Sequence, residues 1–198
     1  MSPKSTSYRY RCGTIVERKC YLRYPHANRA KRVKLLQTVR ADRSDTFIFD
    51  KAAAPGEWAV SGAFAFAPRD PTSLTGKARA AFRGGFLGID SFGWSTLARI
   101  VEATEADRAA AVELLAAQLV RRFGAPDLIT ARAAAREEVA FAASLCEHPA
   151  GMLIAVSRRC ESGTTHEAFR TLQSSAQWHQ APVFTFINAP DEDVEREA

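Results

Sequence analysis

The sequence predicts an α+β fold: a mainly antiparallel sheet of five or six strands with two long helices packed on one face. Short strand-like runs lie before residue 104 and after residue 150, and two long amphipathic helical patterns, residues 104–123 and 127–147, lie between them. Strands and helices segregated in this way favour an α+β arrangement over a doubly wound one. The chain has 198 residues, of which 46% are hydrophobic, enough to bury the core of one domain.

The first elements are predicted to be strands. Lys34–Arg40 and Thr46–Asp50 are short runs with β-branched residues, and the turn residues "RSD" separate them, so an antiparallel hairpin is expected. In "WAVSGAFAFAP", the small residues Ala59, Ser61, Ala63 and Ala65 alternate with Val60, Gly62, Phe64 and Phe66. This alternation predicts another strand, with Phe64 and Phe66 on the same face.

A short helix and a buried strand are predicted on either side of a glycine-rich stretch. The helix covers Leu74–Arg83 and is ended by two glycines. The strand covers Gly93–Thr104, which is rich in Trp, Ile and Val.

The two long helices carry clear end signals. Thr104 is the predicted N-cap of the first, with Asp107 at the third helical position and Gly124 as the C-cap. Asp127 is the predicted N-cap of the second, and Pro149 ends it. The short connection between them predicts an αα-hairpin.

Two further strands are predicted near the end of the domain, at Gly151–Arg159 and at "EAFRTLQ" (Glu167–Gln173). The apolar run "VFTFI" would be an edge strand, and we expect Phe184 and Phe186 to be covered because an exposed apolar edge promotes aggregation.

Charge and aromatic content both change at residue 33. Residues 1–32 hold nine Lys or Arg and a single acidic residue, Glu17, and they hold all four tyrosines, whereas every Phe and Trp lies after Val33. We predict that residues 1–32 are a basic unstructured segment from an over-extended gene start, with Val33 as the true initiator at a GTG codon. A GTA, GTC or GTT codon at Val33 would contradict this. Residues 33–178 are then a single α+β domain, and residues 179–198 are a C-terminal extension with an acidic end.

Composition also bears on location and on partner class. No apolar run approaches the ~20 residues needed to cross a bilayer, and no signal pattern follows Met1, so no membrane partner is expected. The four cysteines form no regular framework, which favours reduced thiols in the cytoplasm. Since the positive charge is concentrated in residues 1–32, nucleic-acid binding is an alternative that depends on that segment alone.

The stretch "FRGGFLGIDSFGW" is the predicted recognition surface. Its glycines lie between a helix and a strand, the reverse of the order in phosphate-binding loops, so a phosphate site is not predicted. Loops that combine glycine and aromatic residues often carry binding residues. The predicted binding residues are Arg83, Gly84, Gly85, Phe86, Phe92 and Trp94.

Cys146, His148, Cys160 and His166 supply the ligand types that zinc prefers. Only the first two lie close together in sequence, and Cys146 lies on the apolar face of its helix, so neither a metal site nor a cofactor is predicted. Cys146 and His148 remain an alternative as the nucleophile and base of a small-molecule-binding enzyme.

Three blocks resemble an uncharacterised proteobacterial family of small proteins over about Val33 to Leu172. They are "VKLLQTVRADRSDTFIFDKAAAPGEWAVSGAFAF", "AFRGGFLGIDSFGWSTL" and "EEVAFAASLCEHPAGMLIAVSRR". The resemblance implies genes near those of molybdenum- and iron–sulfur-containing formate dehydrogenase systems, and hence an accessory or maturation role. It brings no catalytic residues. The function predicted from the sequence is therefore a non-enzymatic accessory or protein-binding factor of a bacterial cell, with an unknown protein partner.

Overall fold

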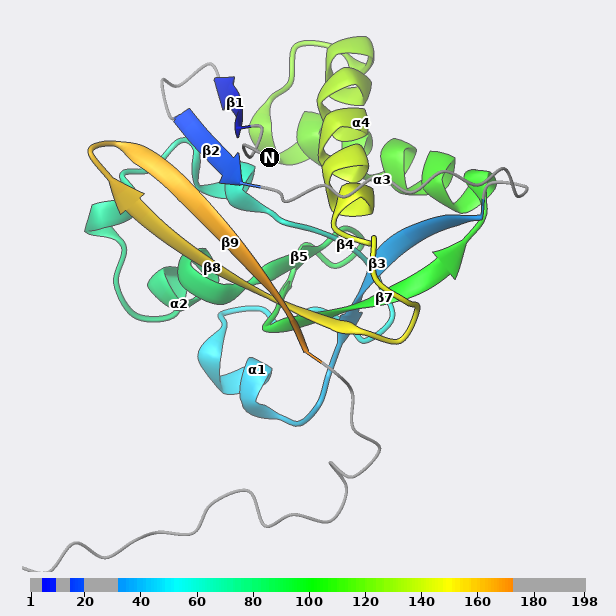
Figure 1. Cartoon of the computed structure of the whole chain (residues 1–198). Coiled ribbons are helices and arrows are strands. Elements are labelled where there is room, and N and C mark those ends of the chain that lie inside the picture. Colours follow the sequence, from blue (N-terminus) through cyan, green and yellow to red (C-terminus); the bar gives the residue numbers. More distant parts are fainter. Residues whose placement is uncertain (1–4, 10–14, 20–31, 173–198) are drawn as a thin grey trace, which may run out of the picture.

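The computed structural model describes residues 5–9, 15–19 and 32–172 of the chain. Within these residues the strands form one strongly twisted sheet in the order β1-β2-β9-β8-β7-β3-β4-β5-β6 (Figure 1). From β9 to β6 all neighbours in this order are antiparallel. These seven strands are β3 (Val33–Val39), β4 (Trp58–Val60), β5 (Phe86–Gly88), β6 (Trp94–Ser95), β7 (Leu97–Ala103), β8 (Leu153–Glu161) and β9 (Thr164–Leu172).

Two short strands precede the seven. β1 (Ser5–Arg9) and β2 (Ile15–Lys19) are antiparallel to each other, and β2 is parallel to β9. These ten residues are extended and paired, whereas the sequence predicts an unstructured segment over residues 1–32. The gene-start hypothesis stays a prediction, which the codon at Val33 decides.

The α+β class and the antiparallel sheet are confirmed, although the antiparallel part has seven strands and not five or six. The difference comes from β5, a three-residue strand with no predicted counterpart, and from β6, a two-residue strand that the sequence predicts as one strand with β7. Strands of that length are too short to show a period of two in the sequence.

The first long helix has both of its predicted ends, whereas the second has its predicted N-cap but ends at Ser144, before the predicted end at residue 147. α3 (Glu105–Phe123) begins with a capping box, in which the Thr104 hydroxyl accepts the Asp107 N–H at 3.1 Å and the Asp107 carboxylate accepts the Thr104 N–H at 2.8 Å. The Thr104 hydroxyl and N–H hold the pKa of the Asp107 carboxyl below its ordinary value. Gly124 is the C-cap, and Asp127 is the N-cap of α4 (Leu128–Ser144).

The main core lies between α3, α4 and one face of the sheet. Leu36 pairs with Ile100, and Ala98 pairs with Ile154, which places these residues on one face. They are buried against Leu115, Val139 and other apolar residues of the two helices. Figure 1 shows both helices on the same side of the sheet, as the sequence predicts. A smaller core consists of Phe49, Phe66, Leu74, Ala81 and Phe82.

The predicted hairpin over residues 34–50 is wrong. Residues Ser44–Ile48 form a short helix, α1, and β3 pairs instead with β4 and β7. Local polar contacts favour the helix: the Asp42 carboxylate accepts the Ser44 N–H at 2.7 Å, and the buried Asp45 accepts the Thr96 hydroxyl. Phe47 is 72% exposed, so the apolar run is not a buried strand.

The predicted strand through Phe66 is correct only as far as Val60. Gly62 has a φ of +80°, and a Cβ there would lie 2.6 Å from the Cβ of Leu87. The chain therefore turns at Gly62 and continues as a 3₁₀ helix, η1 (Ala63–Phe66). As a result, Phe64 enters the main core and Phe66 the smaller one, not the same face of a strand.

The remaining described elements are of the predicted type, helix or strand. α2 (Gly76–Gly84) matches the predicted short helix, and the predicted strand from Gly93 is divided at Thr96 into β6 and β7. The run "VFTFI" lies outside the described residues. Within the described part of the chain, no helix is both long and apolar enough to cross a membrane.

Candidate functional site

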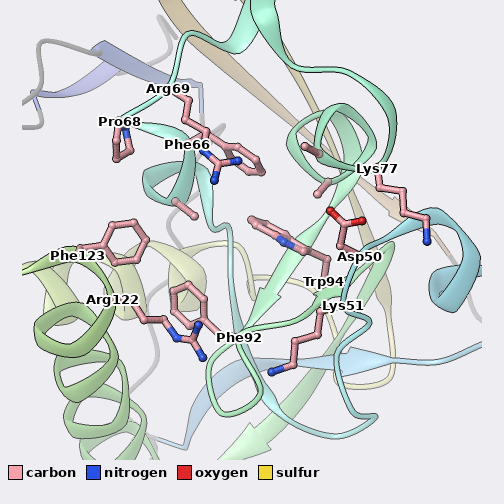
Figure 2. A pocket seen from close by; sticks show the side chains of 13 residues that line it. Asp50, Lys51, Phe66, Pro68, Arg69, Lys77, Phe92, Trp94, Arg122 and Phe123 are labelled. Atoms are coloured by element: carbon pink, nitrogen blue, oxygen red, sulfur yellow. The ribbon is translucent and has the colours of Figure 1, made fainter.

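A cavity of about 420 Å³ lies where η1, α2, the β5–β6 loop and the end of α3 meet (Figure 2). We call it the aromatic cavity. Its aromatic residues are Phe66, Phe92, Trp94 and Phe123, and its charged residues are Asp50, Lys51, Arg69, Lys77 and Arg122.

Trp94 lies at the centre of the aromatic cavity and is fixed by its backbone. Its N–H donates to the Lys51 carbonyl at 2.8 Å, and its carbonyl accepts the Ala53 N–H at 2.9 Å. Its ring stacks on Phe66 with the ring centres 5.0 Å apart and an angle of 30° between the planes. Trp94 is a half-buried residue and lines the aromatic cavity, which makes it available to a ligand there.

Phe92 lies beside Trp94 and has an unusual backbone. Its φ is +57°, a left-handed conformation that is strained for a bulky side chain. Its N–H donates to the Gly88 carbonyl at 3.0 Å, which closes a tight turn. The Arg122 guanidinium lies 4.7 Å from the centre of the Phe92 ring, a cation–π distance, and Phe123 packs nearby at 5.9 Å. Strain of this kind is often retained at a binding or catalytic site.

Glu57 holds the turn from one side. Its carboxylate accepts the N–H of Ala54 at 2.6 Å and that of Ser91 at 2.8 Å, which joins the segment before β4 to the loop that carries Phe92. Gly93 permits this close approach, because a Cβ there would lie 2.6 Å from the Ala52 carbonyl oxygen.

Gln118 holds the turn from the other side. Its amide N–H groups donate to the carbonyls of Ile89 and Asp90, and its oxygen accepts from Arg121 and from Arg122 Nε at 2.8 Å. This buried side chain therefore joins α3 to the loop and orients Arg122 beside Phe92.

Four cations and one carboxylate give the aromatic cavity a positive rim. Lys51 Nζ donates to the Ser91 carbonyl, and Arg122 is held by Gln118. Arg69 and Lys77 are exposed, and among the described residues their side chains make no hydrogen bond or ion pair. Their charges are thus available to an anionic group from outside.

Of the six residues of the predicted surface, Phe92 and Trp94 line the aromatic cavity, and Gly85 packs against the Trp94 ring from outside it, where a Cβ would lie 2.8 Å from Trp94 Cε3. Phe86 is fully buried in the main core, and the Gly85 carbonyl accepts from Arg158. Arg83 is exposed on α2, and Gly84 is half-buried there; neither lines the aromatic cavity.

The cations of the rim and the two supporting residues, Glu57 and Gln118, are not among the site residues that the sequence predicts. The cations come from four separate segments, so no local pattern joins them. Gln118 did leave a signal, because it is a polar residue between Leu115 and Leu119 on the apolar side of α3.

Cys146 and His148 are not arranged as a nucleophile and base. The Cys146 thiol is buried, lies 3.4 Å from the Ala142 carbonyl oxygen, and has its pKa raised to about 12 by burial, with the charge of Lys34 opposing the rise. His148 is exposed, and its carbonyl accepts from Lys34 Nζ at 2.7 Å. No cluster of three or more potential metal ligands occurs among the residues that the structure describes.

A buried ion pair supports the elements around the aromatic cavity. Arg158 Nε donates to the Glu167 carboxylate at 2.7 Å, and its Nη1 donates to the carbonyls of Phe82 and Gly85 at 2.9 and 2.8 Å. The hydroxyl of Ser61 donates to the same carboxylate. These contacts join β8 and β9 to the end of α2 and to the chain before η1.

Comparison with known protein families places this sequence in one of them. The sequence profile of DUF6505, a family of unknown function, matches residues 33–189, and the match begins at the residue where the composition changes. No match is found among curated proteins or among solved structures. The predicted membership in a family without an assigned function is thereby confirmed and extends beyond Leu172. Since the match covers most of the chain, the protein belongs to the DUF6505 family.

Proposed function

We propose that this protein is a non-enzymatic binding factor, with an accessory role, and that its protein partner contacts the aromatic cavity. The observation that carries the proposal is the conformation of Phe92. A strained backbone, held by Glu57 and Gln118, positions this ring between Arg122 and Trp94. Such strain needs a compensating benefit, and a preorganised contact surface supplies one.

The chemistry of the aromatic cavity supports binding more than catalysis. Its residues are aromatic rings and cations, which act by stacking and by charge. Interface residues with the largest energetic contributions are enriched in Trp, Tyr and Arg, and here Trp94 and Arg122 lie on either side of Phe92 (Figure 2).

The thiol of Cys146 also favours a binding function over the enzyme alternative. A nucleophilic cysteine needs a lowered pKa, whereas burial raises the pKa of Cys146 to about 12. A thiol with this pKa is protonated at neutral pH and reacts slowly.

The first candidate partner is the one that the sequence resemblance implies, a molybdenum- and iron–sulfur-containing formate dehydrogenase. The test immobilises the full chain and a Phe92→Ala/Trp94→Ala variant, and measures retention of the purified formate dehydrogenase from the same organism. Retention by the wild type and loss in a variant with an unchanged circular dichroism spectrum would support the proposal. Equal retention by both would overturn the assigned surface, and no retention by the wild type would overturn this partner.

A further inference from the structure

We infer that the aromatic cavity binds an acidic peptide segment of its partner, with one aromatic side chain of that segment stacked on Trp94. This inference rests on the proposed function and names the chemistry of the partner. Three features of the aromatic cavity support it: the charge of its rim, the stacked rings of Trp94 and Phe66, and the distribution of the cations around its opening.

The rim selects for negative charge. Lys51, Arg69, Lys77 and Arg122 face a single carboxylate, Asp50. The described remainder of the chain does not neutralise Arg69 and Lys77, which are exposed and unpaired within it. Complementary charge across an interface accelerates association and disfavours partners of the wrong sign. An acidic segment therefore fits this rim better than a neutral or basic one.

The stacked rings of Trp94 and Phe66 favour an aromatic side chain in the ligand. Trp94 already stacks on Phe66 and keeps part of its surface exposed. A further aromatic side chain would extend this stack in the offset or edge-on geometries that aromatic pairs prefer. An aliphatic side chain of similar volume would gain the burial but not the ring–ring interaction.

The positions of the cations favour an extended peptide over a compact anion. Figure 2 shows Arg69, Lys77 and Arg122 on different sides of Trp94, and they belong to three different segments. A compact anion can pair with fewer of these separated cations at once than a chain that carries several carboxylates can. An extended peptide rises about 3.3 Å per residue, so its carboxylates can reach cations on both sides of a central ring.

The test measures binding of a fluorescent peptide of about eight residues, long enough to span about 26 Å when extended. The peptide carries one Phe flanked by Asp and Glu. Matched peptides replace Phe by Leu, or the acidic residues by Lys, and ADP serves as a compact anion that carries an aromatic ring. We expect the acidic Phe peptide to bind, the Leu peptide to bind several-fold more weakly, and the Lys peptide and ADP not to compete. Raising the salt from about 0.1 to about 1 M shortens the Debye length from about 10 to about 3 Å and should reduce binding at least about tenfold.

Charge reversal in the full chain supplies the matched control. Arg69→Glu/Lys77→Glu should reduce binding of the acidic peptide by about tenfold or more. Arg136→Glu/Arg170→Glu makes the same change in net charge at exposed positions outside the aromatic cavity and should leave binding nearly unchanged. Circular dichroism checks that both variants are folded.

Several results would overturn the inference: no binding of the acidic peptide, equal binding of the Leu peptide, displacement by ADP at lower concentration, or equal loss in the two charge-reversal variants. Its failure differs from failure of the proposed function. If formate dehydrogenase retention needs Phe92 and Trp94 but tolerates Arg69→Glu/Lys77→Glu, the binding function stands and the acidic segment is wrong. If retention tolerates Phe92→Ala/Trp94→Ala, the proposed surface itself is wrong.

Discussion

Glu57 Oε2 lies 2.8 Å from the backbone nitrogen of Ser91, 34 residues further along the chain. The other oxygen of the same carboxylate accepts the N–H of Ala54, and the Glu57 backbone pairs with Thr38 of β3. The Glu57 side chain thus joins the turn that carries Phe92 to the segment before β4, and that segment is anchored on the sheet.

Removing this carboxylate should loosen the aromatic cavity. Hydrogen bonds to charged groups contribute about 1.5–3 kcal/mol each, and Glu57 is half-buried, so Glu57→Ala should lower the free energy of unfolding by about 2–3 kcal/mol. Glu57→Gln keeps one acceptor and should cost less. Urea unfolding followed by circular dichroism measures both. The control is Glu147→Ala, at an exposed side chain that makes no hydrogen bond or ion pair with the described part of the chain. Equal stability of Glu57→Ala and this control would contradict the assigned role.

Adding a methyl group at Gly93 should disturb the same turn from its far side. A Cβ would lie 2.6 Å from the carbonyl oxygen of Ala52, a backbone atom that cannot rotate away. Gly93→Ala should therefore lower the free energy of unfolding by about 1–3 kcal/mol and weaken partner binding through Trp94. Gly84→Ala is the matched control, since its Cβ would meet only the Val156 carbonyl oxygen at 3.8 Å within a helix. Equal loss of stability in both variants would show that steric contact at Ala52 is not the cause.

The long helices could be predicted because their signals are local. Thr104 and Asp107 are three residues apart and form the capping box directly, and Gly124 follows the last helical residue. The segments around the aromatic cavity could not be predicted in this way. Thr46–Asp50 has strand-like composition, but Asp45 is bound by Thr96, which is 51 residues away. At Gly62 the chain leaves the strand with a φ of +80°, and only a glycine fits there because a Cβ would lie 2.6 Å from the Cβ of Leu87; sequence spacing does not reveal this.

The residues of the candidate site also differ in whether a local sequence signal predicts them. Phe92 and Trp94 could be found because aromatic residues in a glycine loop are visible locally. Arg69, Lys77 and Arg122 could not, since they meet only after η1, α2 and α3 have packed. The position of Phe86 in the glycine-rich stretch predicts a binding residue, yet Phe86 belongs to β5 and is buried in the main core.

The buried pair of Arg158 and Glu167 should be essential as a pair. Breaking a buried ion pair by removing one partner costs about 3–5 kcal/mol, because the other charge stays buried. Glu167→Gln should therefore be strongly destabilising. Arg158→Met should be worse, since it also removes the donor to the carbonyls of Phe82 and Gly85.

A double-mutant cycle separates these contributions. The four proteins are the wild type, Arg158→Met, Glu167→Leu and the double variant Arg158→Met/Glu167→Leu. The double variant should be more stable than the sum of the two single changes predicts, and urea unfolding measures the difference. Additive losses would contradict a coupled pair. The exposed pair of Arg159 and Glu161, at 2.9 Å, is the control and should couple by less than about 1 kcal/mol.

The thiol of Cys146 should make stability fall at alkaline pH. Burial raises its pKa from 9.0 to about 12 in the folded protein, whereas the unfolded chain keeps the lower value. Below pH 9 both states hold the proton, so the thiol adds no pH dependence. Between pH 9 and 12 the unfolded chain releases it first, and the free energy of unfolding decreases by up to about 1.4 kcal/mol per pH unit.

Comparison with Cys146→Ala isolates this contribution, because all other titrating groups are common to both proteins. Urea unfolding at about pH 8 and about pH 10 should show the wild type losing about 1 kcal/mol more than the variant over that interval. A second readout is alkylation by iodoacetamide in a protein whose other cysteines are replaced by serine: Cys146 should react slowly while folded and quickly in urea. Rapid alkylation of the folded protein at neutral pH would mean that the thiol is accessible and ionised, which would restore the enzyme alternative.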